Sequence, residues 1–170
     1  KVLPNNQFPV EAYDQFTSQL VPRWLSTDQA IIDAYIALVD KVCPCVIVIH
    51  SQGGLFAFKA AQARPDKVKA IVAVEPAGIG DADKAALIKN IPVLAVFGDY
   101  FDVDTRWATL RKTAEGYFDA VRKAGGKVDI VDLPKQGIRG NSHMLVMDKN
   151  SDQIAGIIQT WLAAQPGLYK

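Results

Sequence analysis

The apolar residues of the chain alternate between short continuous runs and longer stretches in which they recur every three or four positions. The continuous runs predict strands buried on both faces of a parallel sheet, at residues 45–49, 69–74 and 93–97, and a mixed pattern at 128–133 predicts an edge strand. The helical spacing predicts helices at residues 26–41, 54–64, 81–90, 105–124 and from 150 or 151 onward. Strands and helices in alternation predict an α/β fold, a parallel sheet with flanking helices.

The helix expected at residues 26–41 has both a start signal and an apolar face. Ser26 and Gln29 predict a capping box at its first turn. Its apolar face is formed by Ile32, Tyr35, Ile36 and Val39. Residues 1–25 lack a clean period, and we expect an irregular, cap-like segment with one short helix around residues 10–20.

Composition limits the classes of partner. The 170 residues are 49% hydrophobic and 22% charged, which is typical of one globular domain. The 19 basic and 18 acidic residues are interspersed, which argues against a nucleic-acid partner or an anionic membrane surface and favours a small, weakly charged substrate. No apolar run approaches the roughly 20 residues of a membrane span.

The cysteines and histidines are too few and too scattered to predict a metal site or a cofactor. Cys43 and Cys45 flank Pro44, and a bridge between residues two apart would be strained. We therefore expect separate thiols, or thiols that pair with cysteines of another chain.

The first predicted strand ends at His50-Ser51-Gln52-Gly53-Gly54, immediately before a predicted helix. A serine at a sharp strand-to-helix turn can present its hydroxyl as a nucleophile. We expect Gly53 to be needed because a side chain there would crowd the turn. A simple helix N-cap is the alternative role for Ser51, and we expect His50 to be a packing or hydrogen-bonded neighbour rather than a second base.

Side chains capable of chemistry follow the other predicted strands as well. Glu75 ends the second strand, Asp99 and Asp102 follow the third, and His143 lies in the loop after the fourth. The carboxyl ends of parallel strands meet at one edge of a sheet, so these residues are expected to lie near Ser51. Glycines and Asn141 before His143 indicate a backbone shaped to aim that side chain, which favours a general base over a solvated loop histidine.

Four segments carry a resemblance to a known family: HSQGG at 50–54, VEPAG at 74–78, VFGDY at 96–100 and GIRGNSHMLVMDKNSDQIA at 137–155. Together they resemble a group of bacterial and fungal α/β-hydrolase esterases whose acid is a glutamate after the strand that follows the nucleophile strand. The resemblance implies Glu75 as the acid, with Ser51 and His143 assigned by position. Asp99 or Asp102 is the competing acid, because most α/β-hydrolases keep it after the third of these strands.

Two departures from that pattern matter. The motif G-x-S-x-G has Ile49 in place of its first glycine, which implies a wider turn or a variant subfamily. A complete α/β-hydrolase has about eight strands, whereas four are predicted, so we expect only the carboxyl-terminal half of the fold and an exposed apolar edge at 45–49. An amino-terminal chain or segment, or a homo-oligomer, would complete the sheet. Gln52 can donate one backbone N–H to an oxyanion, and a second donor would lie upstream.

The function expected from these residues is hydrolysis of a small carboxylic ester through Ser51, His143 and Glu75, without a cofactor. Candidate pocket residues are Tyr100, Trp107, Met144 and Leu145, with Phe101 and Trp24 as further candidates. A non-catalytic structural or interaction subunit of the same fold is the main alternative. A nucleotide-binding sheet ranks last because the chain lacks a phosphate-binding loop. The resemblance favours a secreted or periplasmic protein.

Overall fold

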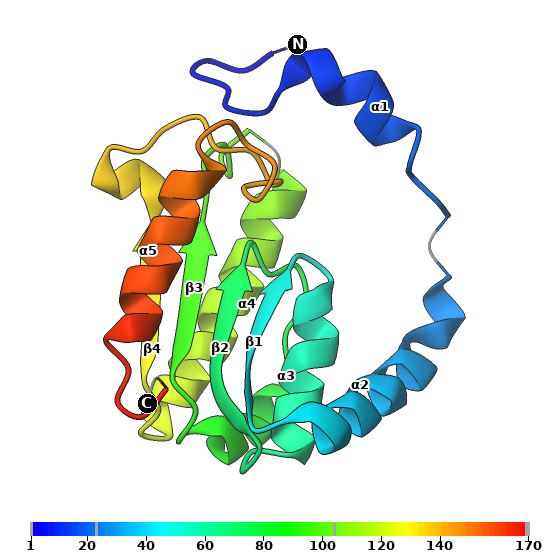
Figure 1. The fold of residues 1–170 in the computed structure, drawn as a ribbon, viewed down its shortest axis with the longest axis vertical. Coiled ribbons are helices and arrows are strands. Elements are labelled where there is room, and N and C mark those ends of the chain that lie inside the picture. Colours follow the sequence, from blue (N-terminus) through cyan, green and yellow to red (C-terminus); the bar gives the residue numbers. More distant parts are fainter. Residues whose placement is uncertain (1, 23, 104, 169–170) are drawn as a thin grey trace.

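The computed structural model describes residues 2–22, 24–103 and 105–168. Within these ranges, four parallel strands form one sheet in the order β1-β2-β3-β4 (Figure 1). Their bounds are Cys45–His50 for β1, Val68–Val74 for β2, Val93–Phe97 for β3 and Val128–Asp132 for β4. The predicted α/β architecture is confirmed, and each predicted strand lies within one residue of its observed bounds.

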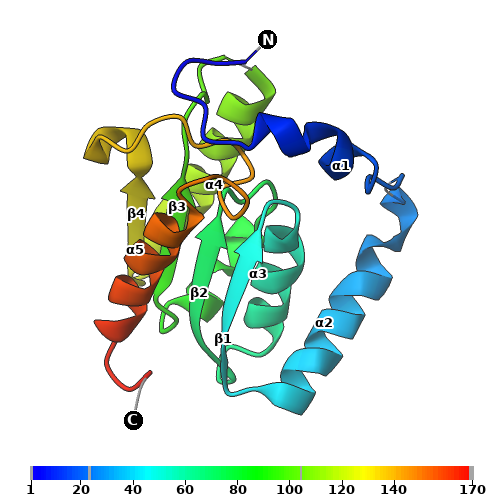
Figure 2. The same cartoon turned by 45° about the horizontal axis from the view of Figure 1, so that its top comes forward.

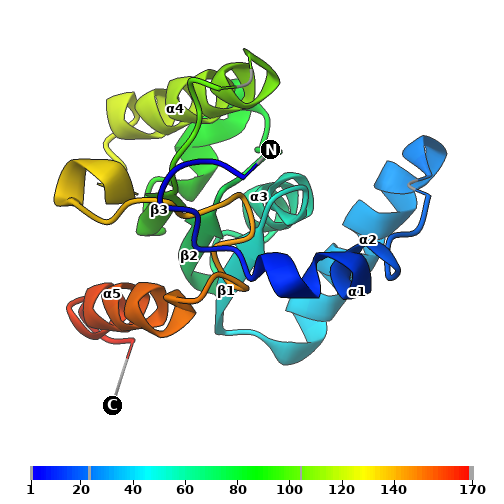
Figure 3. The same ribbon diagram turned by 90° about the horizontal axis from the view of Figure 1, so that it is seen from above.

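Helices cover the two faces of the sheet, as Figure 3 shows from above. The helix α5 (Ser151–Ala163) lies on one face, and α3 (Gly53–Ala63) and α4 (Thr105–Lys123) lie on the other. The helix α2 (Asp28–Val42) lies beyond β1 and packs against α3. The predicted helix at residues 81–90 is a 3-10 helix, η3 (Ala82–Ile88). Another 3-10 helix, η4 (Leu133–Gln136), follows β4.

Alternate residues of each strand enter two separate cores. In β2, Ile71 and Ala73 belong to the core beneath α3 and α4, whereas Val72 and Val74 belong to the core beneath α5. Successive side chains of a strand point to opposite faces, so a continuous apolar run is what a strand with helices on both sides requires. This burial holds the sheet, and thus its carboxyl edge, rigid.

The edge strand β1 is only partly covered. Among the described residues it pairs with β2 alone, and the side chain of Val48 is 59% exposed. The reason is that α5 lies over the β3 and β4 side of the sheet and leaves the same face of β1 uncovered (Figure 1). The expectation of burial on both faces is therefore wrong for this strand, and the expectation of an exposed apolar edge is confirmed.

The amino-terminal region contains short helices and an extended segment that crosses the sheet edge. The 3-10 helix η1 (Val10–Ala12) runs into α1 (Tyr13–Thr17), where Phe8 stacks edge-on against Phe16 with ring centroids 5.6 Å apart. Residues 3–8, which we call the N-terminal strap, lie beside the loop that precedes α5 (Figure 2). Two backbone bonds hold this segment: Gln7 N–H donates to the Gly140 carbonyl at 2.8 Å, and Lys149 N–H donates to the Gln7 carbonyl at 2.9 Å.

The predicted capping box of α2 is wrong. The helix begins at Asp28, and its N-cap is Thr27, which makes no side-chain cap bond. A 3-10 turn, η2 (Leu25–Thr27), precedes α2, so Ser26 lies outside the helix. The Gln29 amide instead donates to Asp33, one turn along the same helix, at 2.8 Å.

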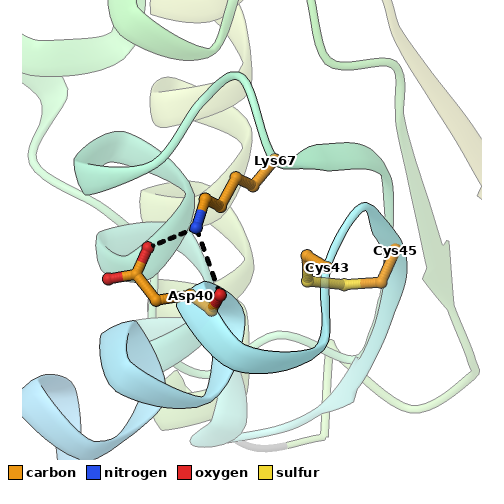
Figure 4. The surroundings of a disulfide bond; sticks show 4 residues. All are labelled: Asp40, Cys43, Cys45 and Lys67. Carbon is orange, nitrogen blue, oxygen red and sulfur yellow. Dashed lines mark hydrogen bonds and ion pairs between the residues drawn. A yellow bond between two sulfur atoms is a disulfide. The ribbon is translucent and has the colours of Figure 1, made fainter.

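Cys43 and Cys45 form a disulfide, which corrects the expectation of separate thiols or of pairing with another chain (Figure 4). Cys43 ends α2 with extended dihedral angles, and Pro44 fixes the next φ, so the chain turns sharply into β1. The turn leaves the two Cα atoms 4.4 Å apart, which is within the range that a disulfide can bridge. Beside it, Lys67 Nζ donates to the Asp40 carboxylate at 2.8 Å and ties the end of α2 to the loop before β2.

The two glycines at the start of α3 differ in how tightly they are packed. A Cβ on Gly54 would overlap the carbonyl oxygen of Gly78, whereas a Cβ on Gly53 would meet only Ile49 at an ordinary 3.7 Å. The tight position is thus Gly54, and the expectation that Gly53 is the constrained residue is wrong. The turn accommodates Ile49 because its side chain lies over Gly53.

We expect Gly54→Ala to lower the free energy of unfolding by at least about 2 kcal/mol, because the added methyl must displace the Gly78 backbone. The matched Gly53→Ala variant should change it by less than about 1 kcal/mol, since alanine favours the helix and meets no clash. Thermal unfolding of both variants measures this contrast. Equal Tm values would contradict the packing assigned to Gly54.

Candidate active site

Three strand ends at the carboxyl edge of the sheet turn through left-handed backbone. Ser51 has φ 54°, Glu75 has φ 46° and Tyr100 has φ 67°, a region that non-glycine residues rarely adopt. The sheet ladder continues into the first two turns: Ser51 N–H donates to the Val74 carbonyl at 3.1 Å, and Glu75 N–H donates to the Val96 carbonyl at 2.9 Å. Such strained positions cost about 1–3 kcal/mol each and are common at functional sites.

The structure brings Ser51, His143 and Glu75 together. Nε2 of His143 lies 2.8 Å from Ser51 Oγ, and Nδ1 of His143 lies 3.2 Å from Glu75 Oε2. In this arrangement the imidazole Nδ1–H donates to the carboxylate, and Nε2 accepts from the serine hydroxyl. The side chain of Glu75 is 4% exposed and that of His143 is 23% exposed, so the carboxylate is buried and the imidazole remains partly open to solvent.

Burial dominates the electrostatics of Glu75. Desolvation raises the pKa of this carboxyl, and its hydrogen bonds from His143 and from the Gly98 N–H, together with the positive charge of Arg111, oppose that rise. Nearby donors and positive charge thus offset part of the cost of burying this carboxylate.

The competing acids have other partners or positions. The carboxylate of Asp99 accepts from the Tyr100 N–H at 2.9 Å and from the Gly140 N–H at 3.0 Å, so both of its oxygens shape loops. Asp102 is exposed. Glu75 is therefore the carboxylate at Nδ1 of His143.

A buried polar network, which the sequence analysis missed, shapes the loop that carries His143. Asp148 is 2% exposed, and its carboxylate accepts from the Ser142 N–H at 2.8 Å, from the Ser142 hydroxyl at 2.7 Å and from the Asn141 amide at 2.9 Å. Asn141 also exchanges hydrogen bonds with Asn150, at 2.7 and 3.1 Å. The signal in the sequence was the cluster of short polar residues on both sides of an apolar stretch, which is typical of side chains that bond to nearby backbone.

Two rings lie close to the imidazole of His143. The indole of Trp107, in the first turn of α4, has its centroid 4.0 Å from that of His143, at an interplanar angle of 35°. The ring of His50 lies 4.8 Å away, and its Nε2 is 2.7 Å from the His143 carbonyl oxygen. Burial lowers the pKa of His50; the hydrogen bond to the His143 carbonyl opposes this shift, and the nearby His143 ring adds a smaller lowering. The expectation of His50 as a hydrogen-bonded neighbour agrees with this geometry.

The candidate pocket residues lie in different environments. Leu145 is wholly buried in the core beneath α5, so its expected place on a pocket surface is wrong; the loop turns this apolar side chain inward. Met144 is half-buried, and Trp107 lies against His143. Tyr100 and Phe101 line a separate cavity of about 350 Å³. Trp24 is 73% exposed, in the extended segment between α1 and α2.

Gln52 is the N-cap residue of α3. The N–H groups at the start of a helix are not used by the helix itself, and the helix dipole favours negative charge there. The position beside Ser51 thus suits a donor to a developing oxyanion.

Two further observations apply to the described part of the chain. Residues 2–22, 24–103 and 105–168 contain no group of three or more His, Cys, Asp and Glu side chains arranged to hold a metal ion. None of the helices in these ranges has both the length and the apolar character needed to cross a lipid bilayer.

Comparison with known proteins gives two informative relatives, although no family model matches. The chain is 29% identical over 193 residues to the probable secreted lipase phiG of Fungal sp. (strain ATCC 74256), a match that covers 83% of this chain and 53% of the lipase. A solved bacterial esterase superposes with a TM-score of 0.85 at 35% identity, covering 95% of this chain and 52% of the esterase. The chain therefore shares an α/β-hydrolase-type fold with this esterase, as the resemblance implied, and spans about half the length of each of these relatives.

Replacement of Glu75 by Gln tests its burial. The pKa of Glu75 in the folded state is raised above the ordinary value of 4.5. The stability that protonated Glu75 contributes is therefore fully present below about pH 4.5 and is lost as the pH rises through the raised pKa. We expect Glu75→Gln to have a higher Tm than the wild type at neutral pH, and this difference to vanish toward pH 4. Thermal unfolding of both proteins across this range measures it. A difference that grows as the pH falls would contradict the assignment.

Proposed function

We propose that the chain carries the catalytic residues of a serine carboxylic-ester hydrolase. The observation that supports this most directly is the continuous set of contacts from Ser51 Oγ through the His143 ring to the Glu75 carboxylate. It joins a nucleophile, a general base and a group that orients the base, which is the requirement for activating a serine hydroxyl.

The proposed reaction has two halves. Ser51 Oγ attacks the ester carbonyl carbon while Nε2 of His143 takes the hydroxyl proton, and Glu75 stabilises the resulting imidazolium. His143 then returns the proton to the departing alcohol, which leaves an acyl group on Ser51. Water attacks this acyl-enzyme by the same route, with His143 again accepting the proton, and releases the carboxylic acid and free Ser51.

The oxyanion of each tetrahedral intermediate needs at least one donor beside Ser51. The Gln52 N–H is the proposed donor from this chain. We place a second donor in the part of the protein that completes the fold, because in α/β-hydrolases it comes from a loop after a strand on the other side of the nucleophile strand.

The relatives support the class of substrate and the location. One is an esterase and the other a probable secreted lipase. We propose that the substrate is a small ester and that the protein is exported, in keeping with the lipase. We propose that residues near the partly open His143 ring contact the acyl and alcohol parts of the ester. Trp107 and Met144 are the candidates.

We also propose that further strands pair with β1. The two relatives are about twice as long as the part that matches this chain, and β1 offers an unpaired, apolar edge. An exposed edge of this kind pairs readily with another strand. The partner is an amino-terminal segment or chain, with a second copy of this chain as the alternative.

Labelling with a fluorophosphonate tests the catalytic proposal. We expect one adduct per chain on Ser51 of the natively purified protein, and none on Ser51→Ala, as read from intact mass and peptide mapping. Glu75→Gln should lower kcat by about 10³–10⁴-fold, because it disfavours the productive imidazole tautomer.

The matched control for the acid is Asp99→Asn, which should retain activity within about tenfold, because Asp99 bonds only to backbone in the loops. Failure of the wild-type protein to react would favour the non-catalytic subunit. A larger loss in Asp99→Asn than in Glu75→Gln would transfer the role of acid to Asp99.

The proposed partner of β1 predicts that Val48 is covered in the whole protein. We expect Val48→Lys to lower the Tm of the natively purified protein by several degrees, which corresponds to about 1–3 kcal/mol for a charge placed against an apolar partner. Val103→Lys is the control, because Val103 has the same 59% exposure in the structure but lies away from this edge. Two results together would refute a strand partner for β1: equal Tm values in the two variants, and fast hydrogen exchange at the amides on the outer side of β1.

A further inference from the structure

We propose that His50 is a positioning residue: its Nε2–H holds the backbone of His143 against the end of β1 and thereby keeps the catalytic ring in line with Ser51. This inference rests on the proposed function. It concerns a different group from the three that take part in the chemistry, since His50 acts on the main chain of His143 and not on a substrate.

The contact joins the rigid and the irregular parts of the site. His50 is the last residue of β1 and directly precedes Ser51, whereas His143 lies 93 positions later in a loop between β4 and α5. The 2.7 Å distance from His50 Nε2 to the His143 carbonyl oxygen therefore fixes the loop relative to the strand that carries the nucleophile. A misplacement of catalytic groups by 1 Å can cost about 100-fold in rate.

The chemistry of the two atoms determines the tautomer. A carbonyl oxygen can only accept a hydrogen bond, so Nε2 of His50 must carry the proton. The imidazole of His143 has the opposite arrangement, since its Nε2 faces the Ser51 hydroxyl and its Nδ1 faces Glu75. The two imidazoles therefore carry their proton on different nitrogens, Nε2 in His50 and Nδ1 in His143. Exchange of the two tautomers would break the hydrogen bonds of both rings.

The neutral form of His50 suits this task. Its ring centroid lies 4.8 Å from that of His143, where a second positive charge would oppose formation of the imidazolium during the reaction. Half-burial is the largest effect and favours the uncharged form of His50, although the hydrogen bond to the His143 carbonyl opposes it. A neutral donor holds the loop without this repulsion. A lysine or arginine in the same place would place a positive charge beside His143.

Two amide substitutions at His50 distinguish the effect of losing the hydrogen bond from the effect of losing the volume of the ring. The amide nitrogen of Gln can reach approximately where the imidazole Nε2 lies, whereas the amide of Asn is shorter and corresponds to Nδ1. We expect His50→Gln to retain kcat within about threefold, and His50→Asn to lower kcat by about 10- to 100-fold with KM changed less than threefold. The assays are hydrolysis of a p-nitrophenyl ester of a short acid and the rate of fluorophosphonate reaction at Ser51, on the whole natively purified protein.

Thermal unfolding of the two variants completes the test. Equal Tm values with unequal kcat support positioning. Equal kcat in the Asn variant and the wild type overturns it, and so does a Gln variant as slow as the Asn variant, because the loss would then come from packing. A wild-type protein without reactive Ser51 refutes the proposed function itself, which distinguishes that failure from failure of the role of His50.

Discussion

The parallel register of β1, β2 and β3 is the constraint on which the site depends. His50 lies opposite Val74, and Val74 lies opposite Val96, so the three strands end within one residue of the same level. Because the chain turns into left-handed backbone one residue beyond β1 and β2, Ser51 and Glu75 leave the sheet at adjacent points. The spacing between serine and acid is thus set by the hydrogen-bond ladder, which two buried cores keep from shifting.

The histidine is held in a different way. Its loop has little regular structure and depends on the Asp148 carboxylate, on His50 and on the N-terminal strap, which reach it from three directions. Buried polar groups are costly unless each one has partners, so a network of this kind is stable in one arrangement of the loop and unfavourable in others. The site therefore combines two groups fixed by the sheet with one fixed by side-chain and strap contacts.

Sequence patterns predicted what local periodicity and position determine. The strands follow from continuous apolar runs, and the approach of Ser51, Glu75 and His143 to one another follows from their places after the carboxyl ends of parallel strands. Contacts between distant segments could not be predicted in this way. The tight packing at Gly54 comes from Gly78, the inward turn of Leu145 comes from the core beneath α5, and the bridge between Cys43 and Cys45 comes from a backbone turn that spacing alone does not reveal.

The N-terminal strap joins the site through contacts between positions that are distant in the sequence. The side chain of Gln7 reaches the Arg139 carbonyl across 132 positions, and Tyr100 reaches the Pro4 carbonyl across 96. Contacts between such distant positions must overcome loop-closure entropy before they contribute stability, so they form after the local βα units. Both of these bonds are exposed to solvent, and we expect such bonds to open before the buried sheet does. Release of the strap would thus remove one of the three sets of contacts that hold the histidine loop, while the sheet, with Ser51 and Glu75, stays folded.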